Sequence, residues 1–439
     1  MSSNGVSSLP AYSWEEIAEH KEKSSRWLVI DDYVYDVTSW SKKHPGGSIL
    51  LGHFAGQDAT EAFAAFHRNS IDYVRKFLKP LRIGRLEKGQ SLPHTDVKED
   101  FEKLRQTAEK MGLFNSSYVF FALVLLQIFA LEVGSYLVLS YYGVNWLTWI
   151  VSVFLAATAQ TQLGWHQHDA GHLSVFRNNK LNRIYHIFLI CFLKGTSGHW
   201  WNHMHYQHHS KPNVIGKDPD VRMDKLFLVG NVMPVEKAKE ESKPSMPYQK
   251  QHNYFFLIGP PLLFPVYFQF MTFRHAYTRR LYLEGFLMIL YYARVFVLLY
   301  PLLGSVGAVL VYYEVMRVIE SHWFTWVTQS NHIPMTIEKD EPTGRAWLLA
   351  QLKATCNIEK SFFNDWFTGH LNFQVEHHLF PQMPRHNYYK VAPLVSSLCT
   401  KHGVEYKVKP LLTAFKDIVR SLEHSGQLWL HTYEEFHSS

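Results

Sequence analysis

Four long apolar runs and a series of short alternating ones divide the chain into two parts. Residues 119–139 are almost entirely apolar, residues 146–163 and 295–313 carry no charge, and residues 253–273 form a run interrupted by prolines. Each run approaches the ~20 residues that a helix needs to cross a bilayer. We predict four membrane spans at these positions; buried helices of a large soluble protein are the alternative. Glu132 should face other helices, because a charge exposed to lipid is costly.

The shorter runs precede the first apolar run. Residues 27–30 and 34–37 have strand-like composition and are separated by two aspartates, which predicts a small soluble domain over residues 11–86. Residues 87–117 form a charged linker, in which apolar positions at helical spacing predict an amphipathic helix. The membrane domain then takes residues 118–439.

Histidines in the second part fall into three clusters, at residues 168–172, 205–209 and 374–378. Positions i, i+3 and i+4 of a helix share one face, so each cluster can direct its imidazoles at one site. Gln374 takes the place of the leading histidine in the third cluster. Seven histidines are too many for one tetrahedral ion, which favours two metal ions, and imidazole suits zinc, copper, iron and nickel alike. The seven are His168, His172, His205, His208, His209, His377 and His378.

Composition narrows the class of protein. Aromatic residues make up 15% of the chain, and the net charge of +6 is mild and spread out, which gives no case for nucleic acid. Cys191, Cys356 and Cys399 are far apart and odd in number, which suggests a reducing compartment and no disulfide framework.

Residues 11–86 resemble the cytochrome b5 family in the His44-Pro-Gly-Gly loop and the segment that ends at His67. The resemblance implies an α+β haem domain in which His44 and His67 bind the iron of haem b from opposite faces. Two axial histidines leave no open coordination position, which suits electron transfer. His53 lies between them and is not expected to be a ligand. The alternative is a relative that has lost the axial pair and binds another apolar ligand.

From His168 onward the chain resembles the membrane fatty acid desaturases, whose signature is one His-x-x-x-His box and two x-x-His-His boxes. Gln374 and the fused haem domain narrow the resemblance to the front-end desaturases, most closely the animal Δ5/Δ6 acyl-CoA group. It implies an all-α multi-pass membrane domain with a cytosolic helical cap, two iron ions and molecular oxygen as co-substrate. The residues leave open the position of the new double bond, the chain length and the choice of CoA or phospholipid carrier.

The resemblance assigns roles to residues. The seven histidines of the clusters are the expected iron ligands, Gln374 sits at a ligand position, and His332 is an additional candidate whose alternative is an interfacial role. Asp169 and Glu376 are candidates for orienting imidazoles by accepting their second N–H. His199, His203 and His370 are expected to be supporting or structural residues.

The expected partners are a polyunsaturated fatty acyl substrate, NADH–cytochrome b5 reductase and a lipid bilayer, and the expected location is the endoplasmic reticulum membrane. Four crossings would place both termini on the cytosolic side, and the Lys and Arg residues between 164 and 252 favour this; three arginines at 274–280 oppose it. The competing functions are a fatty-acid or sphingolipid hydroxylase, a sphingolipid desaturase, or an inactive haem-binding scaffold.

Overall fold

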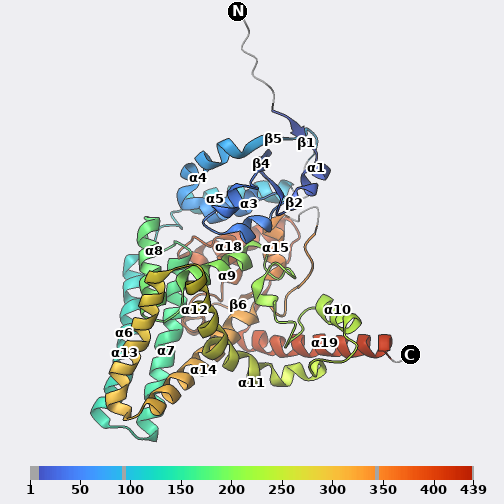
Figure 1. The fold of residues 1–439 in the computed structure, drawn as a ribbon. Coiled ribbons are helices and arrows are strands. Elements are labelled where there is room, and N and C mark those ends of the chain that lie inside the picture. Colours follow the sequence, from blue (N-terminus) through green and yellow to red (C-terminus); the bar gives the residue numbers. More distant parts are fainter. Residues whose placement is uncertain (1–8, 91–94, 342–345, 438–439) are drawn as a thin grey trace, which may run out of the picture.

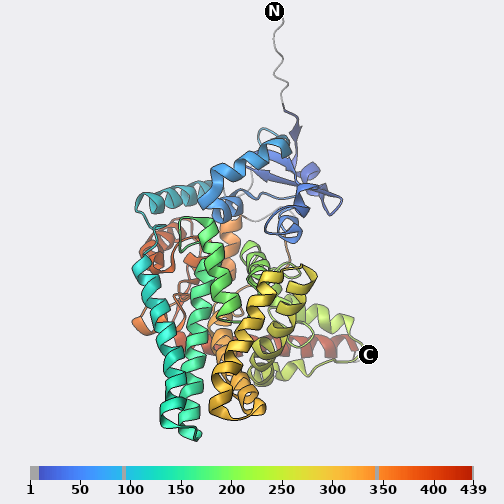
Figure 2. The same cartoon turned by 60° about the vertical axis from the view of Figure 1, so that its left-hand side comes forward.

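The computed structural model describes residues 9–90, 95–341 and 346–437. A small domain of strands and short helices, from β1 to β5, lies at one end of the molecule (Figure 1). A larger domain, from α6 to α19, is almost entirely helical and extends away from it (Figure 2). We call these the N-terminal domain and the helical domain. The arrangement confirms the expected α+β domain followed by a helical domain that carries apolar helices.

The N-terminal domain is built on a five-stranded sheet in the order β1-β5-β4-β3-β2. Asp31 and Asp32 both have positive φ, as a two-residue I′ turn requires, and they join β3 to β4 as an antiparallel hairpin. The strands are β1 (Ala11–Tyr12), β2 (Lys21–Glu22), β3 (Ser25–Ile30), β4 (Tyr33–Asp36) and β5 (Arg82–Leu86), and the helices are α1 (Trp14–Glu19), α2 (Ser48–Gly52), α3 (Thr60–His67) and α4 (Ile71–Leu78).

The linker helix α5 (Thr95–Lys110) connects the two domains. Its buried face consists of Val97, Phe101, Leu104 and Ala108. These residues belong to one hydrophobic core that also contains residues of α3 and of α15 (Trp347–Ala354), α17 (Gln374–Leu379) and α18 (Tyr388–Lys401). Apolar burial therefore holds the N-terminal domain, the linker helix and part of the helical domain together.

Two antiparallel helical hairpins extend away from the N-terminal domain (Figure 1). The first pairs α6 (Tyr118–Tyr142) with α7 (Trp146–Gly171), and the second pairs α13 (Tyr282–Leu303) with α14 (Val306–Ser330). Both turns lie at the end of the molecule farthest from the N-terminal domain (Figure 2). Glu132 of α6 pairs with Arg294 of α13 at 2.9 Å, which confirms that this carboxylate faces another helix.

The predicted fourth span, residues 295–313, is wrong as a single helix. Gly304 adopts a left-handed conformation with φ of 75°, and Ser305 then caps the N-terminus of α14, so the chain reverses inside the uncharged run. The helix that contains the second predicted span, α7, continues beyond it without a break through His168 to Gly171.

The predicted third span is bent. α11 (Gln251–Leu262) passes through a π-helical turn at Leu263–Phe268 into α12 (Gln269–Thr278), where three prolines disturb the helical hydrogen bonds. α11 packs beside the C-terminal helix α19 (Leu411–His437). In the described part of the chain, three helical stretches are long and apolar enough to cross a membrane: Tyr118–Tyr142, Tyr248–Thr278 and Tyr282–Leu303.

The remaining elements form a cap between the hairpins and the N-terminal domain. Ser197 caps the N-terminus of α9 (Gly198–Ser210), because its hydroxyl accepts a hydrogen bond from the Trp200 N–H. The other cap elements are α8 (Asn179–Ile187), a π-helical turn at Phe188–Phe192, α16 (Phe362–Phe367) and a small parallel pair of β6 (Asn357–Ile358) and β7 (Val408–Lys409). Helix α10 (Val232–Glu240) lies outside the cap and packs beside α19 (Figure 1).

Candidate metal centre and haem site

The three histidine clusters come together inside the helical domain, although they lie far apart in the sequence. The last turn of α7 carries the first cluster, α9 carries the second, and the short helix α17 carries the third. In each case a helical turn places the imidazoles on one face. The result is two neighbouring groups of ring nitrogens.

The first group contains five histidines whose ligand nitrogens all lie within 4.8 Å of one another. His205 is central: its Nε2 lies 2.9 Å from Nε2 of His168 and 2.8 Å from Nε2 of His172. The Nε2 atom of His209 lies 3.1 Å from the same nitrogen. The complete first group is His168, His172, His205, His209 and His377.

The second group contains His208, His332 and His378, with ring centroids 4.6–5.0 Å apart. The amide of Gln374 reaches this group, with its Nε2 atom 2.8 Å from Nε2 of His332 and 3.3 Å from Nε2 of His378. The structure thus brings His332 and Gln374 into the centre. The rings of His209 and His378 stack at 4.3 Å, so the two groups lie side by side.

The ring nitrogens of the two histidine groups suit metal ions that prefer neutral nitrogen ligands. Burial, and then the neighbouring imidazoles, lowers the pKa of His209 and His378 well below the usual value for histidine, so both rings are neutral and have lone pairs available. The Nε2 atom of His377 and the Oε1 atom of Gln374 are buried and have no hydrogen-bond partner among the described residues. Unpaired polar atoms are costly in a protein interior, and a bound cation would satisfy them.

Oxygen atoms around the second group fix the orientation of its rings. His208 donates its Nδ1–H to Asp218 at 2.9 Å, and His378 donates to Oε1 of Gln351 at 2.8 Å. His332 donates to the carbonyl of Ala354 at 3.1 Å. Each bond places a proton on Nδ1 and leaves Nε2 of His332 and His378 without one. Burial opposes it, but the Asp218 and Asp220 carboxylates raise the pKa of His208 to about 9, so a metal ion would replace the Nε2 proton of that ring. The sequence interpretation missed both Asp218 and Gln351. Asp218 could have been identified, because an acidic residue shortly after a histidine pair is a signal for such a partner.

Asp169 and Glu376 do not have the predicted role. Asp169 pairs with Arg385 at 3.3 Å, and Glu376 accepts hydrogen bonds from Asn357 at 2.8 Å and Tyr406 at 2.7 Å. Among the described residues neither carboxylate accepts a hydrogen bond from an imidazole. The prediction that they orient imidazoles is therefore wrong, because both are used to join elements of the cap.

The three histidines that were expected to have a supporting role, His199, His203 and His370, lie outside both groups. His199 is exposed and its Nδ1 atom lies 2.8 Å from Nε2 of His275 on α12. His203 faces the N-terminal domain, close to Gly47. His370 is half-buried and adopts a positive φ of 66° in the turn before α17. Their expected supporting role therefore stays a prediction.

The N-terminal domain brings His44 and His67 to face each other. Their ring centroids are 6.1 Å apart, with an angle of 68° between the planes. His67 donates its Nδ1–H to the carbonyl of Phe63 at 2.9 Å, which leaves its Nε2 free, and burial lowers the pKa of His44 to about 4, which keeps it neutral. The pair therefore fits an axially bound haem. His53 instead donates to Ser210 of α9 at 2.8 Å.

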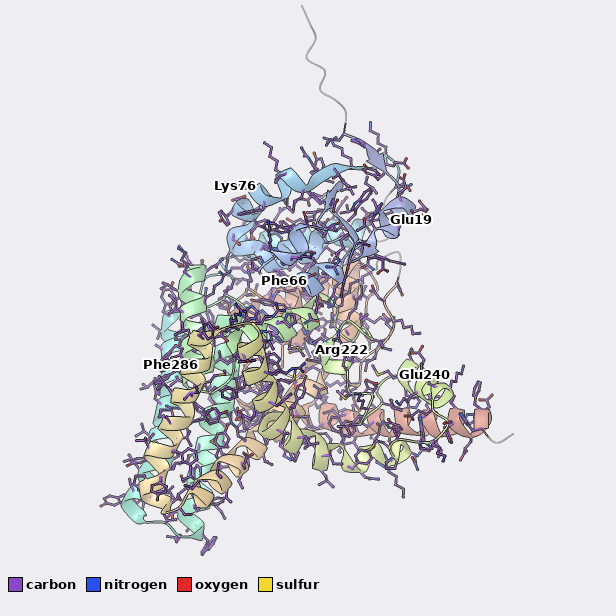
Figure 3. All side chains as sticks on the ribbon, in the orientation of Figure 1. Glu19, Phe66, Lys76, Arg222, Glu240 and Phe286 are labelled. Atoms are coloured by element: carbon purple, nitrogen blue, oxygen red, sulfur yellow. The ribbon has the colours of Figure 1, made fainter. Side chains whose placement is uncertain are left out.

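The two domains meet directly above the histidine groups. Figure 3 shows Phe66, the residue before His67, at the junction of the N-terminal domain with the helical domain. The ring of Phe66 contacts Tyr206 and His209, with ring centroids 6.0 and 6.5 Å away. Phe66 thus contacts the first histidine group and is the chain neighbour of His67, an expected haem ligand.

A largely apolar cavity of about 740 Å³ reaches both histidine groups. Its size falls in the range of small-molecule sites. Exposed residues such as Arg222 and Lys225 mark its mouth, and the buried ion pair of Lys194 with Glu320 lines its interior. The histidines and amide that line it are His168, His205, His208, His332, His377 and Gln374. A long apolar chain could lie in this cavity with its methylene groups beside the metal centre.

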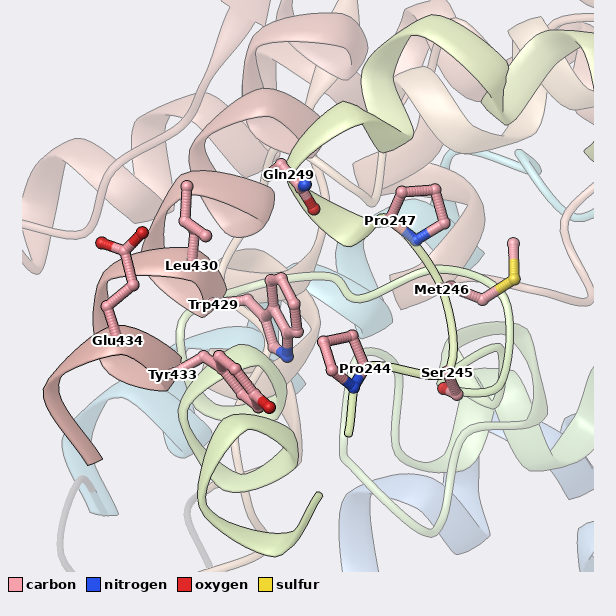
Figure 4. A pocket seen from close by; sticks show the side chains of 9 residues that line it. All are labelled: Pro244, Ser245, Met246, Pro247, Gln249, Trp429, Leu430, Tyr433 and Glu434. Carbon is pink, nitrogen blue, oxygen red and sulfur yellow. The ribbon is translucent and has the colours of Figure 1, made fainter. Parts of the chain in front are cut away.

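A second pocket, of about 440 Å³, lies between α19 and residues 244–249 (Figure 4). Its walls include Trp429, Tyr433 and two prolines. None of the nine residues that line it is a histidine or a cysteine. It offers no metal ligands of that kind, and the larger cavity remains the candidate site.

Comparisons with known proteins agree with this geometry. A family described as "Fatty acid desaturase" matches residues 144–410, and the chain belongs to that family. A "Cytochrome b5-like Heme/Steroid binding domain" matches residues 13–87. Among solved structures, the chain is similar to a cytochrome b5 of Ostreococcus tauri virus 2, with 39% identity over 17% of this chain and 95% of that chain and a TM-score of 0.16. The protein is thus a membrane oxidoreductase with a fused haem-binding domain.

Proposed function

We propose that the protein is a front-end fatty acyl desaturase. It inserts a cis double bond between the carboxyl end and an existing double bond of a polyunsaturated fatty acyl chain, at the Δ6 or Δ5 position. It uses two iron ions and molecular oxygen, and its own haem domain delivers electrons from NADH–cytochrome b5 reductase. The observation that carries the proposal is the pair of histidine groups at the wall of a largely apolar cavity, in contact through Phe66 with an N-terminal domain that matches a haem-binding family.

The side chains of this protein would hold the two iron ions and orient the acyl chain, and the iron and oxygen, when bound, would supply the oxidising power. An unactivated methylene has no acidic proton, so side-chain acid–base chemistry cannot remove its hydrogen, whereas iron and oxygen can when bound. His168, His172, His205, His209 and His377 would hold one ion, and His208, His332 and His378 with Gln374 the other. Asp218 holds a proton on Nδ1 of His208, and Gln351 holds one on Nδ1 of His378, so that each ring presents its Nε2 atom to the ion.

The walls of the cavity position the substrate. Aromatic residues such as Trp200, Phe264 and Phe324 line it and exclude water from the reacting carbons. A bound acyl chain would pass the histidine groups with only a few methylenes exposed to them. This confinement is what would limit oxidation to one position along the chain.

We also propose the domain limits and membrane topology. Residues 11–86 form the haem domain, residues 87–117 the linker and residues 118–439 the desaturase domain, in the endoplasmic reticulum membrane. The two hairpins α6–α7 and α13–α14 would cross the bilayer. Their turns lie at the end of the molecule opposite the N-terminal domain and α9, the helix that carries the second cluster (Figure 1), which supports cytosolic placement of both termini.

Expression in yeast fed single polyunsaturated fatty acids tests the activity. We expect a new double bond on the carboxyl side of the existing ones, located by mass spectrometry. His208→Ala and His378→Ala should each reduce the product at least a hundredfold while leaving the haem absorption spectrum unchanged, because each removes a metal ligand and neither contacts the haem site. His199→Ala is the matched control and should retain activity. A hydroxylated product, or full turnover by either ligand variant, would contradict the proposal.

A further inference from the structure

The segment from Phe66 to Asn69, which includes His67, is attached to all three histidine clusters of the helical domain. The Phe66 ring contacts His209 of the second cluster. The side-chain amide of Asn69 donates to the carbonyl of Leu173, the residue after His172, at 3.0 Å. Gln382, four residues after His378, holds the third contact. Among the described residues, the segment around His44, the other expected haem ligand, does not make contacts with all three clusters.

Gln382 holds this segment through both ends of its side-chain amide. Its Nε2 donates to the Phe66 carbonyl at 2.8 Å, and its Oε1 accepts from the Asn69 N–H at 3.1 Å. Gln382 is buried, at 7% exposure, so these bonds form away from water. Two bonds from one planar amide to the backbone fix both the position and the angle of the segment.

The Phe66 ring occupies a cage made by the helical domain. Tyr206 and Trp347 lie beside it at ring-centroid distances of 6.0 and 6.4 Å, in addition to His209. The cage itself is fixed, because Tyr206 donates to the Gly171 carbonyl at 2.6 Å and Trp347 donates to the His209 carbonyl at 3.3 Å. The ring is therefore enclosed by Tyr206, Trp347 and His209, and His67 is the next residue in the chain.

Polar contacts beside this cage hold the N-terminal domain in the same place. Lys211 donates to Gln57 at 2.6 Å and to Asp340 at 2.9 Å, and Lys217 donates to Asp340 at 2.5 Å. Lys211 and Gln57 are both buried. Gln57 is the contact from the N-terminal domain: its Oε1 accepts from Lys211 and its Nε2 donates to Asp340 at 2.9 Å, so the helical domain holds both ends of one buried amide.

We infer that Phe66 is the contact across which electrons pass from the haem to the metal centre, and that Gln382 is the residue that positions it. The inference rests on the proposed function, since it takes the haem domain as the electron donor. Each transfer oxidises one ferrous haem to ferric and reduces the metal centre by one electron. Two such transfers and two protons, together with the two hydrogens removed from the acyl chain, reduce one O₂ to two waters, and NADH through the reductase reduces the haem again.

Haem reoxidation measured by rapid mixing tests the route. The full-length protein is reduced with NADH and reductase, mixed with acyl-CoA in air-saturated buffer, and followed by haem absorbance. The quantity compared is the part of the rate that depends on acyl-CoA. We expect Phe66→Leu and Gln382→Ala to slow it about ten- to hundredfold, as small losses of alignment do. Tyr73→Leu, an exposed aromatic of the same domain, should match the wild type.

A second measurement separates the route from damage to the metal centre. With dithionite as the reductant, which needs no docked haem domain, Phe66→Leu should form as much double bond in a single turnover as the wild type. Wild-type reoxidation rates in both variants would overturn the inference, and so would a Phe66→Leu protein that dithionite fails to restore. A wild type whose haem is reoxidised without any new double bond would overturn the proposed function instead, and the Phe66 comparison would still decide the route.

Discussion

At the scale of single residues, the oxygen atoms behind the imidazoles decide what the centre can bind. A histidine ring offers a metal ion the nitrogen that carries no proton, and a fixed acceptor at Nδ1 determines which nitrogen that is. His208, His332 and His378 all have such acceptors. The second histidine group is therefore pre-arranged before any ion arrives.

Asp218→Asn should weaken metal binding while leaving all proposed ligands in place. The variant keeps an oxygen near His208 but loses the negative charge, and loss of such a partner costs about 10- to 100-fold in metal affinity. The measurement is the iron retained by purified protein during a titration with a chelator. Asp224→Asn, at the exposed mouth of the cavity, is the control and should retain iron like the wild type. Equal retention by the two variants would contradict this role of Asp218.

At the scale of elements, the two hairpins place the first histidine cluster at the base of the cap. α7 continues from its apolar stretch directly into His168 and His172, so the position of α7 sets the position of both rings. The pair of Glu132 with Arg294 joins the two hairpins. An unpaired charge among apolar helices is costly, which makes this pair a test of how the hairpins pack.

Glu132→Leu should destabilise the protein by about 2–4 kcal/mol, because Arg294 is left without its partner. The double variant Glu132→Leu, Arg294→Leu should recover most of that loss, since neither charge then remains. Thermal unfolding in detergent, followed by tryptophan fluorescence, gives the comparison. If the double variant is as unstable as the sum of the two single variants, the two side chains do not interact.

The histidine clusters could be predicted from the sequence because their spacing is local: one helical turn defines each of them. Of their partners, Asp218 could have been suspected from its place shortly after the histidine pair. Gln351 could not, because only the tertiary structure brings it to His378. The reversal at Gly304 was missed for a different reason. It lies inside an uncharged run, and hydropathy does not distinguish a turn from a continuing helix there.

At the scale of the whole molecule, the N-terminal domain is packed against the helical domain by a shared core and by buried polar contacts. Glu61 of α3 accepts a hydrogen bond from the Trp347 N–H of α15 at 2.9 Å. Burial raises the pKa of Glu61 to about 7, against the opposing effect of Lys98 and with a smaller contribution from Asp58. The junction between the domains therefore contains a carboxyl group that titrates near neutral pH.

This raised pKa gives the stability of the junction a definite pH dependence. The folded state binds the Glu61 proton more tightly than the unfolded state, so its contribution is fully present below pH 4.5 and is lost as the pH rises through 7. Between pH 6 and 8 the unfolding midpoint of the wild type should fall relative to that of Glu61→Gln. Glu15→Gln, on the exposed face of α1, should follow the wild type. A constant difference between wild type and Glu61→Gln across this range would contradict the assignment.

The whole account depends on two metal ions held by histidines beside a separate haem. The most direct measurement is the ratio of total iron to haem in purified full-length protein, from elemental analysis and the haem absorption spectrum. We predict three irons per haem in the wild type and a ratio that falls toward one in His209→Ala, whose ring belongs to the first histidine group and stacks on His378 of the second. A wild-type ratio of one, in protein that desaturates acyl chains, would contradict the account.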